Sequence, residues 1–211
     1  MIVARIEKIT GSCAIPPHYI ATEGWFPVNS FNFGFNSIET PENTPAAPPA
    51  GASAGASAGR SGASTGAGAS AGGATKKKED FTGMTLTKYI DAATCWLMFT
   101  AMQARMSKKG SNRTKADIHV ISSVMIEQKR FIYPSLMIHL ENVLVQQWSI
   151  NGSGDERPEE EITLMYDKAA INYRGTPTGG KFQDFPPGGT SWDQKEQAPF
   201  KYDGFKKYLN G

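Results

Sequence analysis

Residues 131–173 read FIYPSLMIHLENVLVQQWSINGSGDERPEEEITLMYDKAAINY, and this stretch decides the fold. Its first half alternates, with Leu136, Ile138 and Leu140 on one face. The opposite face carries polar residues such as His139. This period of two predicts a half-buried strand with its polar face toward solvent.

The second half of the stretch continues the alternation. Two runs form one predicted strand: Ile162, Leu164 and Tyr166, then Ala169, Ile171 and Tyr173. The parity slips at Asp167–Lys168, as an inserted β-bulge residue would make it do. Residues 151–155 are Asn-Gly-Ser-Gly-Asp, which tolerate the backbone angles of a chain reversal. The stretch therefore predicts one long antiparallel hairpin.

The rest of the chain adds further strands and one helix. Period-two patterns predict strands over 2–9, 24–36, 84–89 and 116–127. Residues 94–108 change to helical spacing, with Leu97, Met98, Ala101, Met102 and Arg105 on one side. Thr94, or Asp91 in competition with it, can cap the start of this helix. The fold class is therefore mainly β, a β-barrel flanked by one α-helix.

Composition divides the chain into a domain, a linker and an extension. Residues 46–74 are almost entirely Ala, Gly, Ser and Pro, and they lack the large apolar side chains that would offset the entropy of ordering them. We expect one domain over 1–175, interrupted by this linker at about 40–79. Residues 176–211 form a Pro/Gly/aromatic extension, which either folds back onto its own barrel or docks on a neighbouring subunit.

Charge and cysteine content exclude several classes of protein. A formal charge of +2 is too small to argue for a nucleic-acid partner. Cys13 and Cys95 do not make a disulfide framework, and Cys95, beside Trp96 and Leu97, is expected to be buried. The N-terminus lacks the apolar core of a signal peptide, and no apolar run reaches the ~20 residues of a membrane helix.

No residue constellation predicts an active site. His18, His119 and His139 lie in different predicted elements, and the last two fall on polar strand faces, where we expect them to be exposed. Metal ligands need convergent spacing, so no metal or other cofactor is predicted. The acids between Asp155 and Glu161 are expected to form a solvated turn, because consecutive acids in a turn point in different directions. We therefore expect no enzymatic activity.

Five segments, in order, resemble the Hcp (haemolysin-coregulated protein) family, the inner-tube subunit of bacterial type VI secretion systems. They are residues 2–12 (IVARIEKITGS), 28–36 (VNSFNFGFN), 86–94 (LTKYIDAAT), 140–159 (beginning LENVLV and ending GSGDERPE) and 164–173 (LMYDKAAINY). The linker lies where the family has a much shorter extended loop, and the extension continues past the family's usual end.

The resemblance implies a structural protein that assembles with itself. The expected assembly is a homohexameric ring that stacks into a tube, with a contractile sheath, a spike protein and effector cargo as partners. The expected route runs from the bacterial cytoplasm to the outside, without a Sec signal peptide and without membrane insertion. The alternative is a monomeric soluble β-barrel that carries a secreted effector or another ligand.

Two groups of residues are candidates for roles in this assembly. The aromatic faces and the extension predict assembly contacts at Phe31, Phe33, Phe35 and Trp192. The segment that leads into the helix predicts structural roles for Tyr89, Asp91 and Thr94. We expect the Tyr89 aromatic ring to be suited to the core, because a tyrosine has an apolar body and a polar tip.

Overall fold

The computed structural model describes residues 1–11, 24–34, 83–106, 113–178 and 181–208. Residues 1–34 and 82–211 belong to one compact unit. The predictions for the linker, Cys13, His18 and Phe35 lie outside the described residues. The side chain of Arg105, predicted to lie on one side of the helix, is also outside the described part of the structure.

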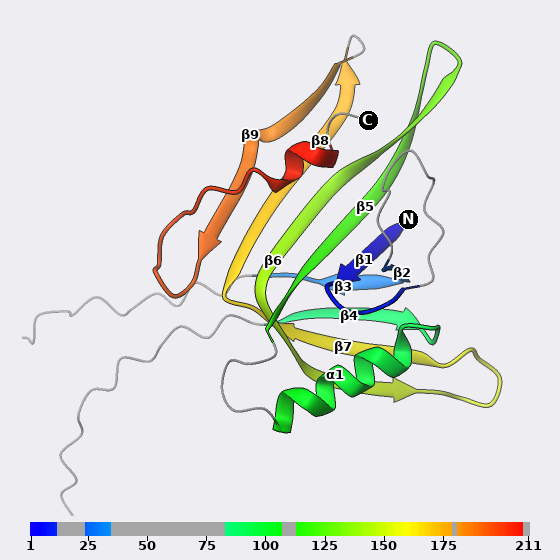
Figure 1. Cartoon of the computed structure of the whole chain (residues 1–211). Coiled ribbons are helices and arrows are strands. Elements are labelled where there is room, and N and C mark those ends of the chain that lie inside the picture. Colours follow the sequence, from blue (N-terminus) through cyan, green and yellow to red (C-terminus); the bar gives the residue numbers. More distant parts are fainter. Residues whose placement is uncertain (12–23, 35–82, 107–112, 179–180, 209–211) are drawn as a thin grey trace, which may run out of the picture. The chain divides into compact units, whose positions relative to one another are not determined.

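The described chain is mainly β, with a single α-helix, as the sequence predicts (Figure 1). Its elements are β1 (Ile2–Ile6), β2 (Trp25–Val28), β3 (Ser30–Asn32), β4 (Met84–Tyr89), α1 (Thr94–Met106), β5 (Thr114–Ile126), β6 (Lys129–Asn151), β7 (Glu159–Met165), β8 (Lys168–Thr178), β9 (Lys181–Asp193) and the 3-10 helix η1 (Gly204–Tyr208).

The strands form two sheets that share β6. The first sheet runs β2-β1-β5-β6-β8-β9 and the second runs β6-β7-β4-β3, with every neighbouring pair antiparallel. Residues 136–141 of β6 pair with β8, and residues 144–151 pair with β7. Asn142 lies between these two parts with φ 57°, a left-handed angle that asparagine tolerates better than most residues. It lies where β6 passes from the first sheet to the second.

A second connection between the sheets lies at the other end of the strand order. The hydrogen-bonded order is open, with β2 at one end and β3 at the other. These end strands are consecutive in sequence, separated only by Asn29, whose N–H donates to Thr87 O in β4 (2.8 Å). The strand predicted over 24–36 is therefore two short strands, one in each sheet. The predicted barrel is thus an open sheet, whose end strands are linked by this segment and not by a ladder.

The predicted hairpin over 131–173 is confirmed, with one change. Strand β6 pairs antiparallel with both β7 and β8, so the two halves of the stretch do lie side by side. The parity slip at Asp167–Lys168 is a break between two strands rather than a bulge within one. At this break the Asp167 N–H donates to Glu141 O (3.1 Å), and the chain passes from the second sheet to the first.

Both faces of the first sheet are buried around β6. Ile138 and Leu140, on the predicted apolar face, are buried, and so are Met137 and His139 on the opposite face. The opposite face is covered by the C-terminal segment, residues 194–208, which ends in the helix drawn in red in Figure 1. Phe205 of this segment joins a core cluster with Met137. The part of the extension that contains Phe205 thus folds back onto its own barrel, and the docking of other parts of the extension on a neighbouring subunit stays a prediction.

Gly189 in β9 allows the C-terminal segment to pack closely against this strand. Its φ of +80° lies in the region that favours glycine, and a Cβ there would lie 2.8 Å from Ile171 O and 3.3 Å from Phe205 Cε2. The register of the β8–β9 ladder jumps between Ile171 and Tyr173, next to this position. The glycine therefore allows β9 to bend while Phe205 packs against it.

We predict that Phe205→Ala lowers the free energy of unfolding by about 3–5 kcal/mol, the usual cost of truncating a buried phenylalanine. Urea unfolding monitored by tryptophan fluorescence measures this change. Lys206→Ala is the matched control, because the Lys206 side chain is 73% exposed and its loss should stay within about 0.5 kcal/mol. A Phe205→Ala variant as stable as the control would mean that the C-terminal segment does not pack on its own barrel.

Candidate functional site

A buried ion pair lies where β4 leads into α1. The side chains of Lys88 and Glu160 are fully buried, with Lys88 Nζ 2.6 Å from Glu160 Oε1. An ammonium has three N–H donors, and all three are used. They go to Glu160 Oε1, to Asp91 Oδ1 (2.7 Å) and to Tyr89 O (2.8 Å). A buried charge is tolerated when it is paired and hydrogen-bonded in this way.

Glu160 also holds two residues on other elements. Its Oε1 accepts a hydrogen bond from Thr94 Oγ1 (2.8 Å), and its Oε2 accepts one from Trp148 Nε1 (2.6 Å). The prediction of a solvated acidic turn is therefore wrong for Glu160. The acid lies in β7, which pairs with β4 on one side and β6 on the other, so its carboxylate points into the protein. We call Lys88, Asp91, Thr94, Trp148 and Glu160 the buried polar network.

The side chains of Asp91 and Thr94 each accept a hydrogen bond from a backbone N–H at the start of α1. Asp91 Oδ1 accepts from the Ala93 N–H (2.8 Å), and Thr94 Oγ1 accepts from the Asp91 N–H (2.9 Å). Both contacts satisfy backbone donors that the first helical turn leaves without partners. Tyr89 lies differently from the expectation, since it is 42% exposed. Its aromatic ring lies 5.0 Å from the Arg157 guanidinium, a cation–π distance, and not in the core.

We predict that Asp91→Ala lowers the free energy of unfolding by roughly 0.5–2 kcal/mol, the range for a lost helix cap. The upper end is expected because Lys88 also loses one of its three acceptors. Chemical unfolding measures this, with Asp155→Ala as the control, because Asp155 is exposed in the β6–β7 turn. Equal stability of the two variants would contradict a structural role for Asp91.

Helix α1 is apolar on its outer side as well as its inner side. Leu97 is fully buried, whereas Trp96 is 50% exposed, Phe99 51% and Met102 55%. The exposed three recur at intervals of three residues, so they line one face of the helix. We call them the helix stripe. Cys95 is also exposed, which corrects the prediction that it is buried among these residues. A helix with large apolar side chains on two sides normally has a partner on each of them.

A groove separates the helix stripe from β6. It is lined by Met98, Ala101, Met102, Gln146, Gln147 and Trp148, and has a volume of about 680 Å³. Trp148 is held in place by its hydrogen bond to buried Glu160. The buried polar network therefore fixes one wall of this groove, and the helix that it caps supplies the other.

A second group of exposed apolar side chains lies on β8 and β9. Tyr173 is 51% exposed, Phe185 46% and Trp192 36%. The ladder pairs Tyr173 with Phe185 and Trp192 with Ala169, so all three point to the same face. We call them the sheet row. Trp192, a predicted assembly residue, thus lies on the surface with two aromatic neighbours that the sequence analysis did not single out.

The other predicted assembly residues are less exposed. Phe31 pairs with Leu86 in the β3–β4 ladder and is half-buried. Phe33 is also half-buried, with its aromatic ring stacked 6.0 Å from that of Tyr166. The structure thus brings Phe31 to β3, the end strand of the second sheet, and Phe33 against Tyr166, which lies between β7 and β8.

The predicted exposure of His119 and His139 is wrong, because the C-terminal segment covers their face of the first sheet. His139 is 5% exposed and stacks on Tyr202, with ring centroids 4.3 Å apart. Its Nδ1 donates to Asp117 Oδ1 (2.6 Å), and Arg5 donates to Asp117 Oδ2 (3.0 Å). Burial would raise the pKa of Asp117, but the hydrogen bond and the charges of His139 and Arg5 outweigh it and lower this pKa.

His119 is buried beneath the same C-terminal segment. Its ring lies 4.8 Å from that of Trp25 and meets the ring of Tyr208 edge-on at 4.6 Å. Burial disfavours the charged imidazolium and lowers the pKa of His119 to about 3. At neutral pH His119 is therefore an uncharged aromatic side chain of the core.

We predict that folding stability falls as the pH is lowered from 7 toward 4, in part through His119. Between its ordinary pKa of 6.5 and its folded pKa of about 3, the unfolded chain binds a proton at His119 that the folded chain does not. The free energy of unfolding therefore loses at most about 1.4 kcal/mol per pH unit from this residue. His119→Phe should reduce the pH dependence between 4 and 6.5, measured by urea unfolding at several pH values. An unchanged slope would contradict this account.

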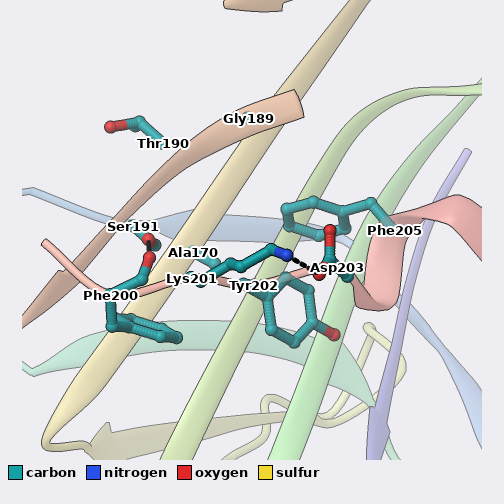
Figure 2. A pocket seen from close by; sticks show the side chains of 9 residues that line it. All are labelled: Ala170, Gly189, Thr190, Ser191, Phe200, Lys201, Tyr202, Asp203 and Phe205. Carbon is teal, nitrogen blue, oxygen red and sulfur yellow. Dashed lines mark hydrogen bonds and ion pairs between the residues drawn. The ribbon is translucent and has the colours of Figure 1, made fainter. Parts of the chain in front are cut away.

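A small cavity lies beneath the C-terminal segment. Figure 2 shows Phe200, Tyr202 and Phe205 lining it, with the backbone of β9 on another side, and its volume is about 260 Å³. Three of the polar side chains around it are engaged with other groups of the protein. Lys201 pairs with Asp203, and Ser191 donates to Phe200 O. The cavity thus has the character of a packing space under the cover, without a convergent set of ligand-binding groups.

The described residues contain neither a metal-binding cluster nor a helix that could cross a membrane. Within them, no group of three or more His, Cys, Asp or Glu side chains has a geometry that could hold a metal ion. Among the helices that the structure describes, none has both the length and the apolar character needed to cross a membrane.

The comparison with protein families returned one match. The model of the family described as "Type VI secretion system effector, Hcp" matches residues 55–173. A comparison with curated proteins found no match.

Solved structures resemble this chain over most of its length. One is described as a type six secretion system protein, with a TM-score of 0.62 and 16% identity, over 94% of this chain and 98% of that one. Hcp1 from Salmonella typhimurium has a TM-score of 0.56 and 14% identity over 94% and 97%. A type VI secretion system effector from Yersinia pestis has a TM-score of 0.53 and 13% identity over 92% and 99%. At these identities the structural likeness shows a shared fold.

Proposed function

The chain belongs to the Hcp family of type VI secretion system proteins, and from this we propose that it is a structural subunit of the secretion tube that assembles as a homohexameric ring. The observation that carries the proposal is the family match over residues 55–173. The shared fold with Hcp1 from Salmonella typhimurium supports it.

The distribution of exposed apolar residues also supports the proposal. A closed ring needs a heterologous interface, in which two different patches of one subunit meet the complementary patches of its two neighbours. Among the described residues, the helix stripe and the sheet row are two candidates for such patches. They lie on different parts of the fold, because α1 packs beside residues 146–148 of β6 whereas β8 pairs with residues 136–141.

We further propose the finer steps of assembly and use. Rings stack into a tube that interacts with a sheath and a spike protein, and the lumen passes or carries effector cargo. In this proposal the subunit acts in the bacterial cytoplasm during assembly and afterwards outside the cell, and it carries out no catalysis. Tyr89, Asp91 and Thr94 act by holding α1 in place, and Phe31, Phe33, Phe35 and Trp192 by contacting other subunits.

One observation favours the alternative of a monomeric carrier. The groove beside α1 has a volume of about 680 Å³, which is within the range of ligand-binding pockets. Its lining combines methionine and tryptophan with two glutamines, so an apolar peptide segment with a few polar groups would fit it. A carrier of this kind would work as a single subunit.

We predict that the purified full-length chain has the mass of a closed hexamer by native mass spectrometry. Negative-stain images should show rings with a central channel. The reason is that the two apolar patches are covered together only when each copy contacts two neighbours. A monomer at every concentration and salt condition tested would contradict the tube proposal and support the carrier.

A further inference from the structure

The sheet row is the uncovered end of a core face. Ile138 and Leu140 of β6 are buried inside the barrel, and the ladder places Ile171 and Ala169 of β8 opposite them on the same face. Tyr173 continues that face one step further along β8. The apolar core face of the first sheet therefore extends past the part that the second sheet covers. A sheet with an apolar face requires a second layer against it.

The opposite face of the same two strands is already occupied. Ala170 belongs to the core cluster that contains Phe205 and Tyr208, and the C-terminal segment lies over this face. The described part of the C-terminal segment therefore supplies a second layer on one side of β8–β9 only. Among the described residues, the sheet row stays about one third to one half exposed. We therefore look to a second copy of the chain for the missing layer.

The helix stripe is the complementary surface on the same chain. Helices and sheets pack as adjacent layers around an apolar interface, and the stripe lies on the outer side of α1, where the described residues leave it about half exposed. The groove beside it has a volume of about 680 Å³, which is enough for a large side chain. Its wall is preformed, because Glu160 holds Trp148 in place. Aromatic anchors that fill such preformed pockets contribute most of the binding energy of protein interfaces.

The two surfaces are also of similar size. Three large side chains, each about one third to one half exposed, present on the order of 300–350 Å² on each side. Their contact would bury roughly 700 Å² in total, a little under half of a standard interface of ~1,600 Å², before the residues around them are counted. Pairing either patch with its own copy would leave the other patch uncovered, whereas head-to-tail pairing covers both.

From these observations we propose that the helix stripe of one subunit packs on the sheet row of the next subunit in the ring, with an aromatic residue of the row entering the groove beside α1. This inference rests on the proposed hexameric ring and names its interface. Trp96, Phe99 and Met102 form one side of the interface, and Tyr173, Phe185 and Trp192 form the other.

Two charged double variants of the full chain test this interface. Trp96→Glu with Phe99→Glu disables the helix stripe, and Tyr173→Glu with Phe185→Glu disables the sheet row. All four positions are about half exposed, so circular dichroism and melting temperature should show that both variants remain folded. Lys206→Glu is the control for added negative charge, because its exposed side chain lies in the C-terminal segment on the opposite side of β8–β9.

We expect each double variant to be monomeric by native mass spectrometry, while the wild type and the control form hexamers. An equimolar mixture of the two double variants should form a heterodimer with the summed mass, because one intact stripe meets one intact row and the remaining contacts are disabled. A single-residue version of each variant, Phe99→Glu and Phe185→Glu, provides the same test if either double variant does not fold.

Two results would overturn the interface while leaving the proposed function intact. One is a wild-type hexamer together with variants that still form hexamers. The other is a pair of folded monomeric variants that do not combine on mixing, which would mean that the stripe and the row contact different surfaces. A wild type that is itself monomeric would overturn the proposed function, and the interface with it.

Discussion

The first sheet must be covered on both faces around β6, and the rest of the structure depends on this constraint. On one face Ile138 and Leu140 pack inside the barrel, and on the other Met137 and His139 lie beneath the C-terminal segment. A strand with two buried faces needs two further layers, and here they come from distant parts of the chain. The second sheet supplies one layer, and the segment that contains Phe205 supplies the other.

The elements of the fold could be predicted from the sequence because their signals are local. Alternation around Leu136 and Ile162 identifies strands, and the change to helical spacing after Thr94 identifies α1. The alternation of apolar residues shifts at Asp167, as the sequence indicates, but the shift marks a change of sheet and not a bulge. The two cannot be told apart from the sequence, because both change which residues share a face. The order of the five segments was sufficient to predict the family.

The burial of polar residues could not be predicted in the same way. His119 and His139 lie on faces that are polar by sequence, and they are buried only because residues more than 60 positions later fold over them. In the sequence, Glu160 is one of several neighbouring acids, and nothing local distinguishes it from them. Its role depends on Lys88, which lies in a strand that is distant in sequence. Cys95 shows the reverse error, since an apolar local sequence predicted burial for a residue on the outer side of α1.

The Lys88–Glu160 pair illustrates what such a buried network contributes. Its two charges are costly to remove from water, so the pair by itself is weak evidence of stability. Its geometry is nevertheless restrictive, because Lys88 has three acceptors and Glu160 holds both Thr94 and Trp148. Losing one member would leave the other charged and buried, at a cost of about 3–5 kcal/mol. The network therefore specifies the position of α1 relative to β4, β6 and β7.

The two faces of the β8–β9 pair connect folding with the proposed assembly. Phe205 packs on one face of these strands, and the sheet row lies on the other. Strand β9, which carries Phe185 and Trp192, lies at the edge of the first sheet and pairs with β8, so the C-terminal segment helps to hold the row in a defined geometry before a neighbour arrives. The buried polar network does the same for the groove beside α1. In the proposed ring, each subunit therefore presents two surfaces that its own core has already ordered, which reduces the entropy lost when the subunits associate.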